Sequence, residues 1–529
     1  MSRTPLFAAV KKALARSFHD QGLVVPRSSA LTRRRLLRLS AAAAGAAALS
    51  PVLDWSAYAK EQRPKGPVAI IGGGVAGLTA AYRLHQAGAK AVVFEASNRW
   101  GGRMFTHYDF YKGMFCELGG ELVDTGHEDL QKLAAEVGVE MQNVTTEGGD
   151  ELYFFQGAFH TPKDMIDPEK KTGAFAPIAK KIAADAAKLT DKDENWTRYA
   201  HKLDNMSLKA YLEQFRGKTD DWAIDLLDVA YDIEEGLPAE EQSSLMMVDL
   251  IGTDMGEPFQ IFGESDEVFR IKGGSSALIN ALVAALENKI EMKQGYALTA
   301  LDYKDGKIVA SFDAPGGASS ESFDAMILAL PFTKLRQVKG LERLRLGTEK
   351  LKCIRELGMG TNAKIMNGTT SRVWRSPDSG LPAPSNGNIF SDLDFQNFYE
   401  TSRAQPGDAG ILTNYLGSKG GQTDAKSALD AFRSGLAKMS PKIAESLDPS
   451  AVVSWFWSTY PYTLGSYASA KVGQYTTMFE QAAEPALNGR LQFAGEHTSS
   501  EFYGYMNGGV ESGNRASAAL IEVMALQKK

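Results

Sequence analysis

The sequence predicts a mixed α/β fold, in which one domain built on a parallel sheet is assembled from separated segments and a second domain of sheet plus helices is inserted. Three observations predict it. The chain has 529 residues, more than one ordinary domain needs. A short apolar, strand-like run at 67–71 leads into a glycine-rich turn. Strand and helix patterns return near the end of the chain, as expected of a discontinuous domain.

Changes in composition along the chain give the expected limits of these domains. The stretch 163–240 is charged and helix-like, and 372–425 is rich in Pro, Ser, Gly and Asp. The expected division is residues 1–59 as an export segment, 60–140, 265–335 and 450–529 as the cofactor-binding domain, and 141–264 and 336–449 as the substrate-binding domain.

The N-terminal segment has the order of an export signal. Thr32 is followed by three arginines, then by a small-residue apolar run at 39–53 and a small-x-small cleavage site at Ala57-Tyr58-Ala59. The paired arginines are typical of twin-arginine export, which moves folded proteins. The apolar run is too short and too rich in alanine for a stable membrane anchor. We therefore expect a periplasmic or secreted protein; the alternative is a basic tail without this role.

Charge and composition exclude several classes of function. The whole chain has a formal net charge of −6 and residues 1–59 carry +7, so the remainder carries −13, which disfavours a nucleic-acid partner. Cys116 and Cys353 are the only cysteines and lie far apart, and the seven histidines show no ligand spacing. No disulfide framework and no metal site are expected.

The first glycine-rich turn has the spacing of a dinucleotide-binding fingerprint. Residues 72–77 place glycines in the pattern Gly-x-Gly-x-x-Gly. Gly72 permits a tight turn, Gly74 lets a pyrophosphate approach the backbone, and Gly77 lets the following helix pack closely on the strand. The N-terminus of that helix offers free N–H groups to phosphates.

The segments after the turn distinguish this fingerprint from an ordinary glycine-rich loop. A helix is predicted over 78–87 and a second strand over 91–94, ending at Glu95. Glu95 stands 18 residues after Gly77 and can accept hydrogen bonds from ribose hydroxyls. Arg103 ends a Gly-Gly turn shortly afterwards, and an arginine there can reach the same diphosphate as a bidentate donor. This second clamp favours FAD over NAD.

Further motifs resemble the flavin-containing amine oxidase family, which includes monoamine oxidases, polyamine oxidases and L-amino-acid oxidases. They are the Arg-Trp-Gly-Gly-Arg run at 99–103, Glu-Leu-Gly-Gly-Glu at 117–121, Gly-Gly-Ser at 273–275, Phe-Ala-Gly-Glu-His at 493–497, and the glycine-rich block at 504–513. Together they frame nearly all of residues 66–525. The resemblance implies a Rossmann-like FAD-binding domain with an inserted substrate domain.

The resemblance also implies roles in cofactor binding. Glu496 would accept a hydrogen bond from the ribityl chain, the backbone N–H of Met506 would face the flavin pyrimidine ring, and the segment at Ala297 would contact the adenine. A surface carboxylate is the alternative for Glu496. The same resemblance places these further residues at the cofactor: Ala76, Ala96, Arg103, Gly119, Gly120, Glu121, Trp457, Gly495 and Tyr505.

Lys364, Tyr467 and Tyr505 are the candidate catalytic residues. Lys364 resembles the family's lysine that holds a water against the flavin N5; the alternative is an edge-strand lysine facing solvent. Tyr467 and Tyr505 resemble the two rings that flank the amine and exclude water. Trp457 belongs to the same segment, and core packing is its favoured alternative. Ser466 stands where monoamine oxidases carry a flavin-linking cysteine, so non-covalent FAD is expected.

The implied reaction is oxidative deamination of a primary amine or L-amino acid. A hydride passes from the carbon that bears the neutral amine to flavin N5, the imine is hydrolysed to an aldehyde or keto acid and ammonia, and oxygen becomes hydrogen peroxide. The expected partners are thus a small-molecule amine or amino acid and molecular oxygen. A homodimer stays open. His497 adjoins the flavin block but need not be catalytic.

The sequence does not decide the substrate, and it leaves two alternatives to an amine oxidase: a related flavoenzyme of different chemistry, or an FAD-binding protein without turnover. Many L-amino-acid oxidases place an arginine just after the Gly-Gly turn, and residues 119–124 contain none. Arg270 or Arg372 could hold a carboxylate instead, whereas Glu121 could either bind a second ammonium or support the flavin domain. The alternatives to an oxidase are a related flavoenzyme, such as a tryptophan-type 2-monooxygenase, a desaturase or a protoporphyrinogen-type oxidase, and an exported FAD-binding protein without turnover.

Overall fold

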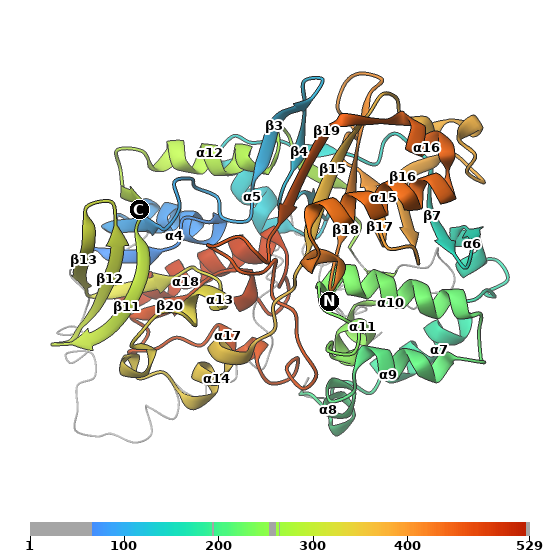
Figure 1. Cartoon of the computed structure of the whole chain (residues 1–529). Helices are drawn as coiled ribbons and strands as arrows, with labels where there is room; N and C mark the ends of the chain where they lie inside the picture. The colour runs from blue at the N-terminus through green and yellow to red at the C-terminus, as the bar shows by residue number, and fades with distance from the viewer. Residues whose placement is uncertain (1–65, 193–194, 253–260, 264, 525–529) are drawn as a thin grey trace, which may run out of the picture.

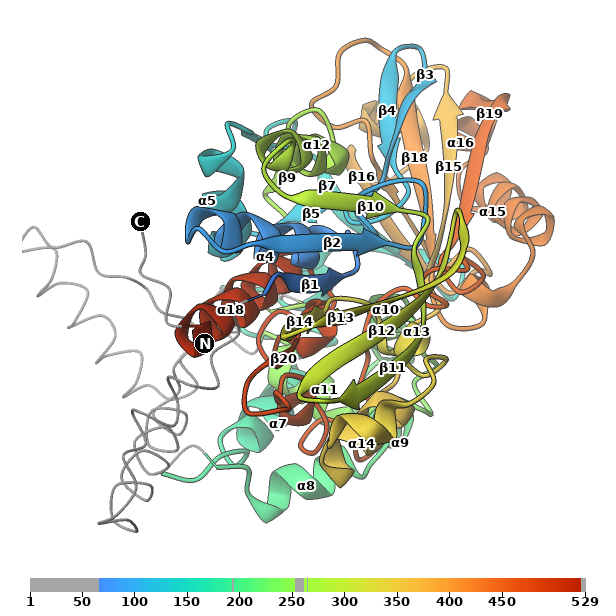
Figure 2. The same ribbon diagram turned by 90° about the vertical axis from the view of Figure 1, so that its left-hand side faces the viewer.

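A parallel five-stranded sheet forms the centre of one half of the molecule (Figures 1 and 2). The computed structural model describes residues 66–192, 195–252, 261–263 and 265–524. The strands, in spatial order, are β10 (Glu291–Gln294), β2 (Ala91–Glu95), β1 (Val68–Ile71), β14 (Ala325–Leu328) and β20 (Leu491–Phe493). All four neighbouring pairs are parallel. The buried, apolar β1, β2 and β14 are typical of strands covered on both faces.

Helices cover one face of this sheet and a second, smaller sheet covers the other. The helices α4 (Val75–Gln86), α12 (Ser275–Leu286) and α18 (Met506–Met524) share a buried core with Val68, Ile70 and Val93. The opposite face packs Ala69 and Phe94 against the antiparallel strands β11 (Ala297–Lys304), β12 (Lys307–Ala314) and β13 (Gly317–Phe323). Figure 2 shows these three layers from the side.

A seven-stranded sheet forms the other half of the molecule and carries Lys364. Its order is β19 (Leu447–Phe456), β15 (Ala363–Thr369), β18 (Gly410–Leu416), β17 (Asn397–Glu400), β16 (Ser385–Ser391), β7 (Asp150–Phe155) and β8 (Ala158–His160). Within the described part of this sheet, β16 and β7 pair in parallel and the other neighbouring strands pair antiparallel. One face packs on α15 (Ala425–Met439) and α16 (Pro441–Ser446) through a core that includes Phe398 and Phe432.

A cluster of helices lies beyond the other face of this sheet, around a core that includes Tyr231 and Phe390 (Figure 1). The helices are α6 (Pro162–Met165), α7 (Ala176–Ala186), α8 (Arg198–Asp204), α9 (Leu208–Leu212), α10 (Asp221–Glu235) and α11 (Ser244–Leu250). Gly236, with φ of 64°, ends α10 in the left-handed conformation that glycine adopts without strain. The end of α10 is thereby fixed beside the sheet.

Smaller elements join the two halves. The hairpin of β3 (Thr106–Tyr111) and β4 (Met114–Glu117) and the sheet of β5 (Leu122–Val123), β9 (Phe269–Ile271) and β6 (Met141–Asn143) lie between them, with α5 (Glu128–Glu136) alongside. The remaining helices, α13 (Phe332–Leu335), α14 (Thr348–Glu356) and α17 (Phe479–Ala482), pack below the three-stranded sheet.

These layers confirm the predicted mixed α/β class, while the exact domain limits stay a prediction. The predicted helix at 78–87 begins earlier, at Val75, because Gly77 lies inside α4 rather than before it. Within the described residues, no helix is long and apolar enough to span a bilayer. The predicted export segment at 1–59 lies outside the described part of the chain.

Candidate active site

The turn after β1 leaves open space where a phosphate would lie. Gly72 has φ of 111°, and a Cβ on Gly77 would lie 1.9 Å from the Gly72 carbonyl oxygen, so both positions need glycine. A Cβ on Gly74, by contrast, would have no protein atom closer than 3.8 Å. Gly74 caps α4 without a side-chain hydrogen bond, and Ala76 is buried in the first turn. The helix therefore presents its N–H groups to open space, as an anion site requires.

The residues expected at the ribose and adenine lie together at the end of β2. One oxygen of Glu95 accepts from the Gly73 N–H at 2.8 Å, and the other accepts from the N–H and the hydroxyl of Ser97, both at 2.8 Å. The Tyr296 N–H donates to the Glu95 carbonyl at 2.9 Å. This bond holds Ala297, the first residue of β11, next to Glu95 and Ala96.

Arg99 supplies an unsatisfied donor beside the same turn. Its Nη2 donates to the Gly102 carbonyl at 2.5 Å, but its buried Nη1 has no hydrogen-bond partner in the described chain. The guanidinium lies over the Phe105 ring, 4.0 Å from its centroid, and belongs to the segment whose Gly101 is bridged to Gly74. A buried N–H without a partner is costly, and an acceptor on a bound dinucleotide would satisfy it. The turn and its free donors therefore fit a dinucleotide, and Arg99 is a candidate ligand that the sequence motifs did not identify.

Arg103 instead links the two ends of the chain. Its Nη1 donates to the Ser466 carbonyl at 2.7 Å and to Glu496 at 2.6 Å, across 393 residues of sequence. Glu496 is buried and also accepts the Gly504 N–H at 2.7 Å, and the Gly495 N–H donates to the Ser512 hydroxyl at 2.9 Å. The N-terminal and C-terminal motifs thus form one site. A direct bond from Arg103 to the diphosphate stays a prediction.

Close contacts also join the second Gly-Gly pair to the C-terminal block. A Cβ on Gly120 would lie 2.7 Å from the Met506 Cγ, at the start of α18, and one on Gly119 would lie 1.8 Å from the Arg103 carbonyl. Trp457 is buried and donates from its indole N–H to the Leu118 carbonyl at 2.9 Å. Its position is that of a packed core residue below Gly119, and a cofactor contact for Trp457 stays a prediction.

Lys364 points into this site from β15 and forms a buried ion pair. Its Nζ donates to Glu121 at 3.0 Å and to the Gly119 carbonyl at 2.8 Å. Both side chains are buried, with 8% and 6% of the Lys364 and Glu121 side chains exposed. The alternative of a solvent-facing edge lysine is excluded by this burial and by the position of β15 between β18 and β19. Two of the three ammonium protons are used, which leaves one to hold a water or another acceptor.

The Glu121 carboxylate accepts hydrogen bonds from three side chains. Besides Lys364, one oxygen accepts the Tyr399 hydroxyl at 2.7 Å and the other accepts the Thr401 hydroxyl. Burial acts to raise the pKa of Glu121, but Lys364 and these two hydroxyls hold it below its ordinary value. Because both oxygens are occupied by the protein, Glu121 is not free to bind a second ammonium, and its position fits the support role.

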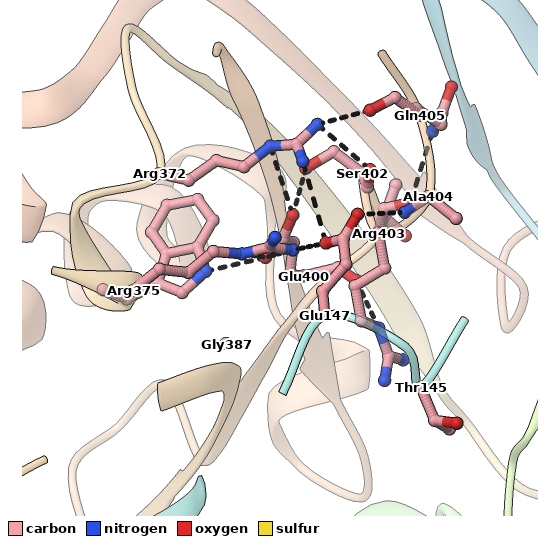
Figure 3. Close-up of polar contacts among 12 residues, drawn as sticks. Thr145, Glu147, Arg372, Arg375, Gly387, Glu400, Ser402, Arg403, Ala404 and Gln405 are labelled. Carbon is pink, nitrogen blue, oxygen red and sulfur yellow. Dashed lines mark hydrogen bonds and ion pairs between the residues drawn. The ribbon is translucent and has the colours of Figure 1, made fainter. Parts of the chain in front are cut away.

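A buried cluster of charges fixes the strand end that carries Tyr399 and Thr401. Glu400 accepts from Arg375 at 2.6 Å and from the Trp374 indole at 2.7 Å. Figure 3 shows Arg372, Arg375, Glu147 and Glu400 gathered on one side of this strand end. Since neighbouring residues of a strand point to opposite faces, the cluster lies on the far side from Glu121. It therefore anchors the contacts of Glu121 from behind.

Neither arginine suggested by the sequence is free to bind a substrate carboxylate. Arg372 donates to the Ala409, Ser402 and Gln405 carbonyls at 3.0, 3.2 and 2.8 Å (Figure 3). Arg270 is buried and donates to the Gln142 side chain at 3.1 Å and to the Thr401 carbonyl at 3.0 Å. Both side chains serve the protein itself, so that expectation is not supported.

Tyr467 and Tyr505 lie side by side at the end of α10. A Cβ on Gly504, next to Tyr505, would be 3.5 Å from the Tyr467 ring. The Tyr467 hydroxyl donates to the Glu234 carbonyl, and the Tyr505 hydroxyl donates to the Glu234 carboxylate at 3.3 Å. The Tyr415 and Tyr467 hydroxyls are 3.0 Å apart. Tyr415 and Glu234 could not be identified from the sequence, because neither stands in a recognisable motif.

Ser466 and His497 lie beside the residues of the site, and both side chains are buried. The Ser466 hydroxyl donates to the Asn362 side chain at 2.6 Å, which fixes it within the protein. His497 is buried, and neither ring nitrogen has a partner in the described residues. Burial, followed by the nearby arginines and Lys350, holds the pKa of His497 well below its ordinary value, so the ring is neutral.

Among the described residues, no group of three or more potential ligands could hold a metal ion.

Known proteins resemble this chain over most of its length. The L-amino-acid oxidase of Pseudechis australis is 24% identical over 481 residues, which cover 86% of this chain and 87% of that protein. The L-amino-acid oxidase of Gloydius blomhoffii is 24% identical and covers 85% and 88%. A putrescine oxidase bound to putrescine shares the fold with a TM-score of 0.69, 21% identity and coverage of 86% and 99%. Cyclohexylamine oxidase from Brevibacterium oxydans IH-35A gives 0.71, 21%, 87% and 99%.

The family model described as flavin containing amine oxidoreductase matches residues 75–521. This match confirms the resemblance drawn from the motifs and makes the chain an oxidoreductase with a flavin cofactor. It spans both halves of the molecule, from the first turn of α4 to the last turns of α18. The chain therefore belongs to the family of flavin-containing amine oxidoreductases.

Proposed function

We propose that the protein is an oxidase that uses non-covalently bound FAD to deaminate a primary amine or an L-amino acid. The observation that carries the proposal is the chain of contacts from Lys364 to the tyrosines. Lys364 lies at the Gly119 carbonyl and over the Tyr415 ring, whose hydroxyl is 3.0 Å from that of Tyr467. Tyr505 precedes Met506, the residue that a Cβ on Gly120 would meet at 2.7 Å. The expected products are an imine, hydrolysed to an aldehyde or keto acid with ammonia, and hydrogen peroxide. When bound, the flavin would supply the hydride acceptor.

Each residue of the site has a task that follows from its contacts. The N-terminus of α4, Arg99 and Glu95 would hold the dinucleotide through its diphosphate and ribose. The two tyrosine rings would orient the amine and exclude water. Lys364 would place its third N–H on a water in the site, because Glu121 and the Gly119 carbonyl fix the ammonium. The start of α18, at Met506, would add a positive dipole end toward developing negative charge.

The related monooxygenase and desaturase chemistries stay alternatives, as does binding of FAD without turnover. A peroxide-coupled screen of primary amines and L-amino acids with the purified flavoprotein separates them. We expect ammonia and peroxide in equal amounts from the substrate that is turned over. An amide product would identify a monooxygenase, and the absence of peroxide with every amine would contradict the proposal.

The mode of cofactor attachment is tested on the same protein. Because the Ser466 hydroxyl cannot form a thioether and is bonded to Asn362, we expect acid precipitation to leave all the yellow flavin in the supernatant, as FAD. Flavin retained in the washed protein pellet would show a covalent link at another residue.

We also propose that residues 1–59 direct twin-arginine export of the folded flavoprotein. The support is the order of the arginines at 33–35, the apolar run and the cleavage site. Replacing both Arg33 and Arg34 by lysine is expected to keep the protein in the cytoplasm, whereas the unaltered chain reaches the periplasm with FAD bound. Equal export of both forms, measured by cell fractionation, would contradict this route.

A further inference from the structure

Glu234 places a carboxylate at the tyrosine pair without a cation to match it. It is half-buried at the C-terminal end of α10, where the helix dipole adds further negative potential. The Tyr505 hydroxyl donates to one of its oxygens at 3.3 Å. Among the described residues, no lysine, arginine or histidine nitrogen lies within 4.0 Å of this carboxylate. A desolvated carboxylate in this position is stabilised by a cationic ligand.

Two cations near the site are already engaged: Lys364 is paired with Glu121, and Arg270 donates to a backbone and an amide oxygen. Arg403 donates its Nε to the Glu400 carbonyl at 3.0 Å, and its charge acts on Glu267. Burial nevertheless raises the pKa of Glu267 to about 8, against the lowering by Arg403. Figure 3 shows the guanidinium of Arg403 directed away from the buried cluster of Arg372 and Arg375. The tyrosine pair therefore faces an unbalanced negative charge, which disfavours a substrate carboxylate beside it.

The tyrosine pair makes Glu234 part of a binding site rather than an isolated acid. The Tyr467 hydroxyl is tied to the Glu234 carbonyl and the Tyr505 hydroxyl to its carboxylate, so both rings and the acid have fixed relative positions. Aromatic rings accept the apolar and amine parts of a ligand, and the carboxylate accepts a positive group. A ligand whose reacting amine lies between the rings can engage the carboxylate as well if it carries a second cation.

We propose that Glu234 binds a second positive charge of the substrate, so that the preferred substrate is a diamine or polyamine without a carboxylate on the reacting carbon. This inference rests on the proposed oxidase function and names its substrate class. It gives to Glu234 the role that the sequence offered to Glu121, whose two oxygens are taken by Lys364, Tyr399 and Thr401.

The ionisation of Glu234 gives the preference a pH dependence. Burial and the charge of Asp124 raise the pKa of Glu234 to about 7, against a lowering by the Tyr505 hydroxyl. The titratable groups that face it are Asp124, Tyr231, Glu235, Glu267, Tyr415, Tyr467 and Tyr505. Since the carboxylate is anionic only above its pKa, the affinity for a dication rises as the pH rises through about 7.

Three compounds with closely related skeletons test the proposal. They are 1,4-diaminobutane, n-butylamine, which lacks the second ammonium, and L-ornithine, which adds a carboxylate. For the unaltered holoenzyme we expect kcat/KM for the diamine to exceed that for butylamine and for ornithine at least about tenfold, as for an ion pair of about 1.4 kcal/mol. Glu234→Gln should remove that advantage, so that within this variant the kcat/KM values for the diamine and for butylamine differ by less than about threefold.

Binding without turnover separates this inference from the proposed function. Under anaerobic conditions the dithionite-reduced holoenzyme cannot oxidise the diamine, and calorimetry gives its affinity directly. We expect Glu234→Gln to weaken this affinity about tenfold and to abolish its rise through pH 7, whereas Glu234→Asp retains part of both. Glu240→Gln removes an exposed carboxylate of the same segment and serves as the matched control.

The outcomes are distinct. An unchanged ratio of diamine to butylamine in Glu234→Gln, or better turnover of ornithine than of the diamine, would overturn the role of Glu234. If no amine is oxidised but the diamine binds to the reduced protein and depends on Glu234, the proposed oxidase function fails while the cation site stands. Retained flavin absorbance in Glu234→Gln shows that the variant has folded around its cofactor.

Discussion

Lys364→Met is expected to slow flavin reduction by substrate or flavin reoxidation by oxygen about 10²-fold or more, a loss typical of removing one preorganised electrostatic group. The reason is that Lys364 brings the only ammonium group that the described structure shows at the Gly119 carbonyl, held there by Glu121. FAD should stay bound, because the phosphate and ribose contacts come from other residues. Stopped-flow absorbance measures both half-reactions.

Removal of this lysine should also destabilise the protein. Glu121 would keep the Tyr399 and Thr401 hydroxyls but lose its cation, and breaking a buried ion pair on one side costs about 3–5 kcal/mol of unfolding free energy. The double variant Lys364→Met/Glu121→Gln should recover part of that loss but not the flavin rates. Lys352→Met, at an exposed position, is the control. Unchanged rates of both half-reactions in Lys364→Met would exclude a role of Lys364 in catalysis.

Gly77→Ala is expected to abolish FAD binding or to prevent folding. The added Cβ would lie 1.9 Å from the Gly72 carbonyl oxygen and 3.3 Å from the Ile70 side chain. Both neighbours belong to β1 and its turn, so the helix must move away from the sheet and the phosphate space is lost. We expect purified protein without flavin absorbance, or only insoluble protein.

A matched substitution separates this clash from the general effect of replacing a glycine. A Cβ on Gly347 would meet no atom within 4 Å, so Gly347→Ala should change neither the flavin content nor the melting temperature appreciably. Full flavin content in Gly77→Ala, measured by the ratio of flavin to protein absorbance, would contradict the requirement for glycine at this contact with Gly72.

The turn after β1 could be predicted from the sequence, because the residues that define it lie close together along the chain. The strand, the glycine turn and Glu95 lie within 28 residues, and each residue type is required by backbone geometry within that unit. The predicted helix start was three residues late because Gly77 resembles a helix breaker, whereas the structure uses its missing Cβ for packing inside α4.

The polar contacts of the site could not be predicted, because they join residues that are distant in sequence. Thr401 lies 280 residues from Glu121, and no pattern within either segment identifies the other. Arg372 could be a substrate ligand by its residue type, but its guanidinium donates to three backbone carbonyls of the protein. Glu234 lies in an ordinary amphipathic helix, and only the packing of α10 against the two tyrosines gives it a function.

The most direct test of amine oxidation by this flavoprotein is anaerobic mixing of the purified protein with a series of primary amines, diamines and L-amino acids, followed by admission of oxygen. We expect that the absorbance of oxidised flavin disappears with at least one amine, that ammonia is released, and that oxygen then restores the flavin with one equivalent of hydrogen peroxide. Flavin that stays oxidised with every compound, in protein with full FAD content, would contradict this expectation.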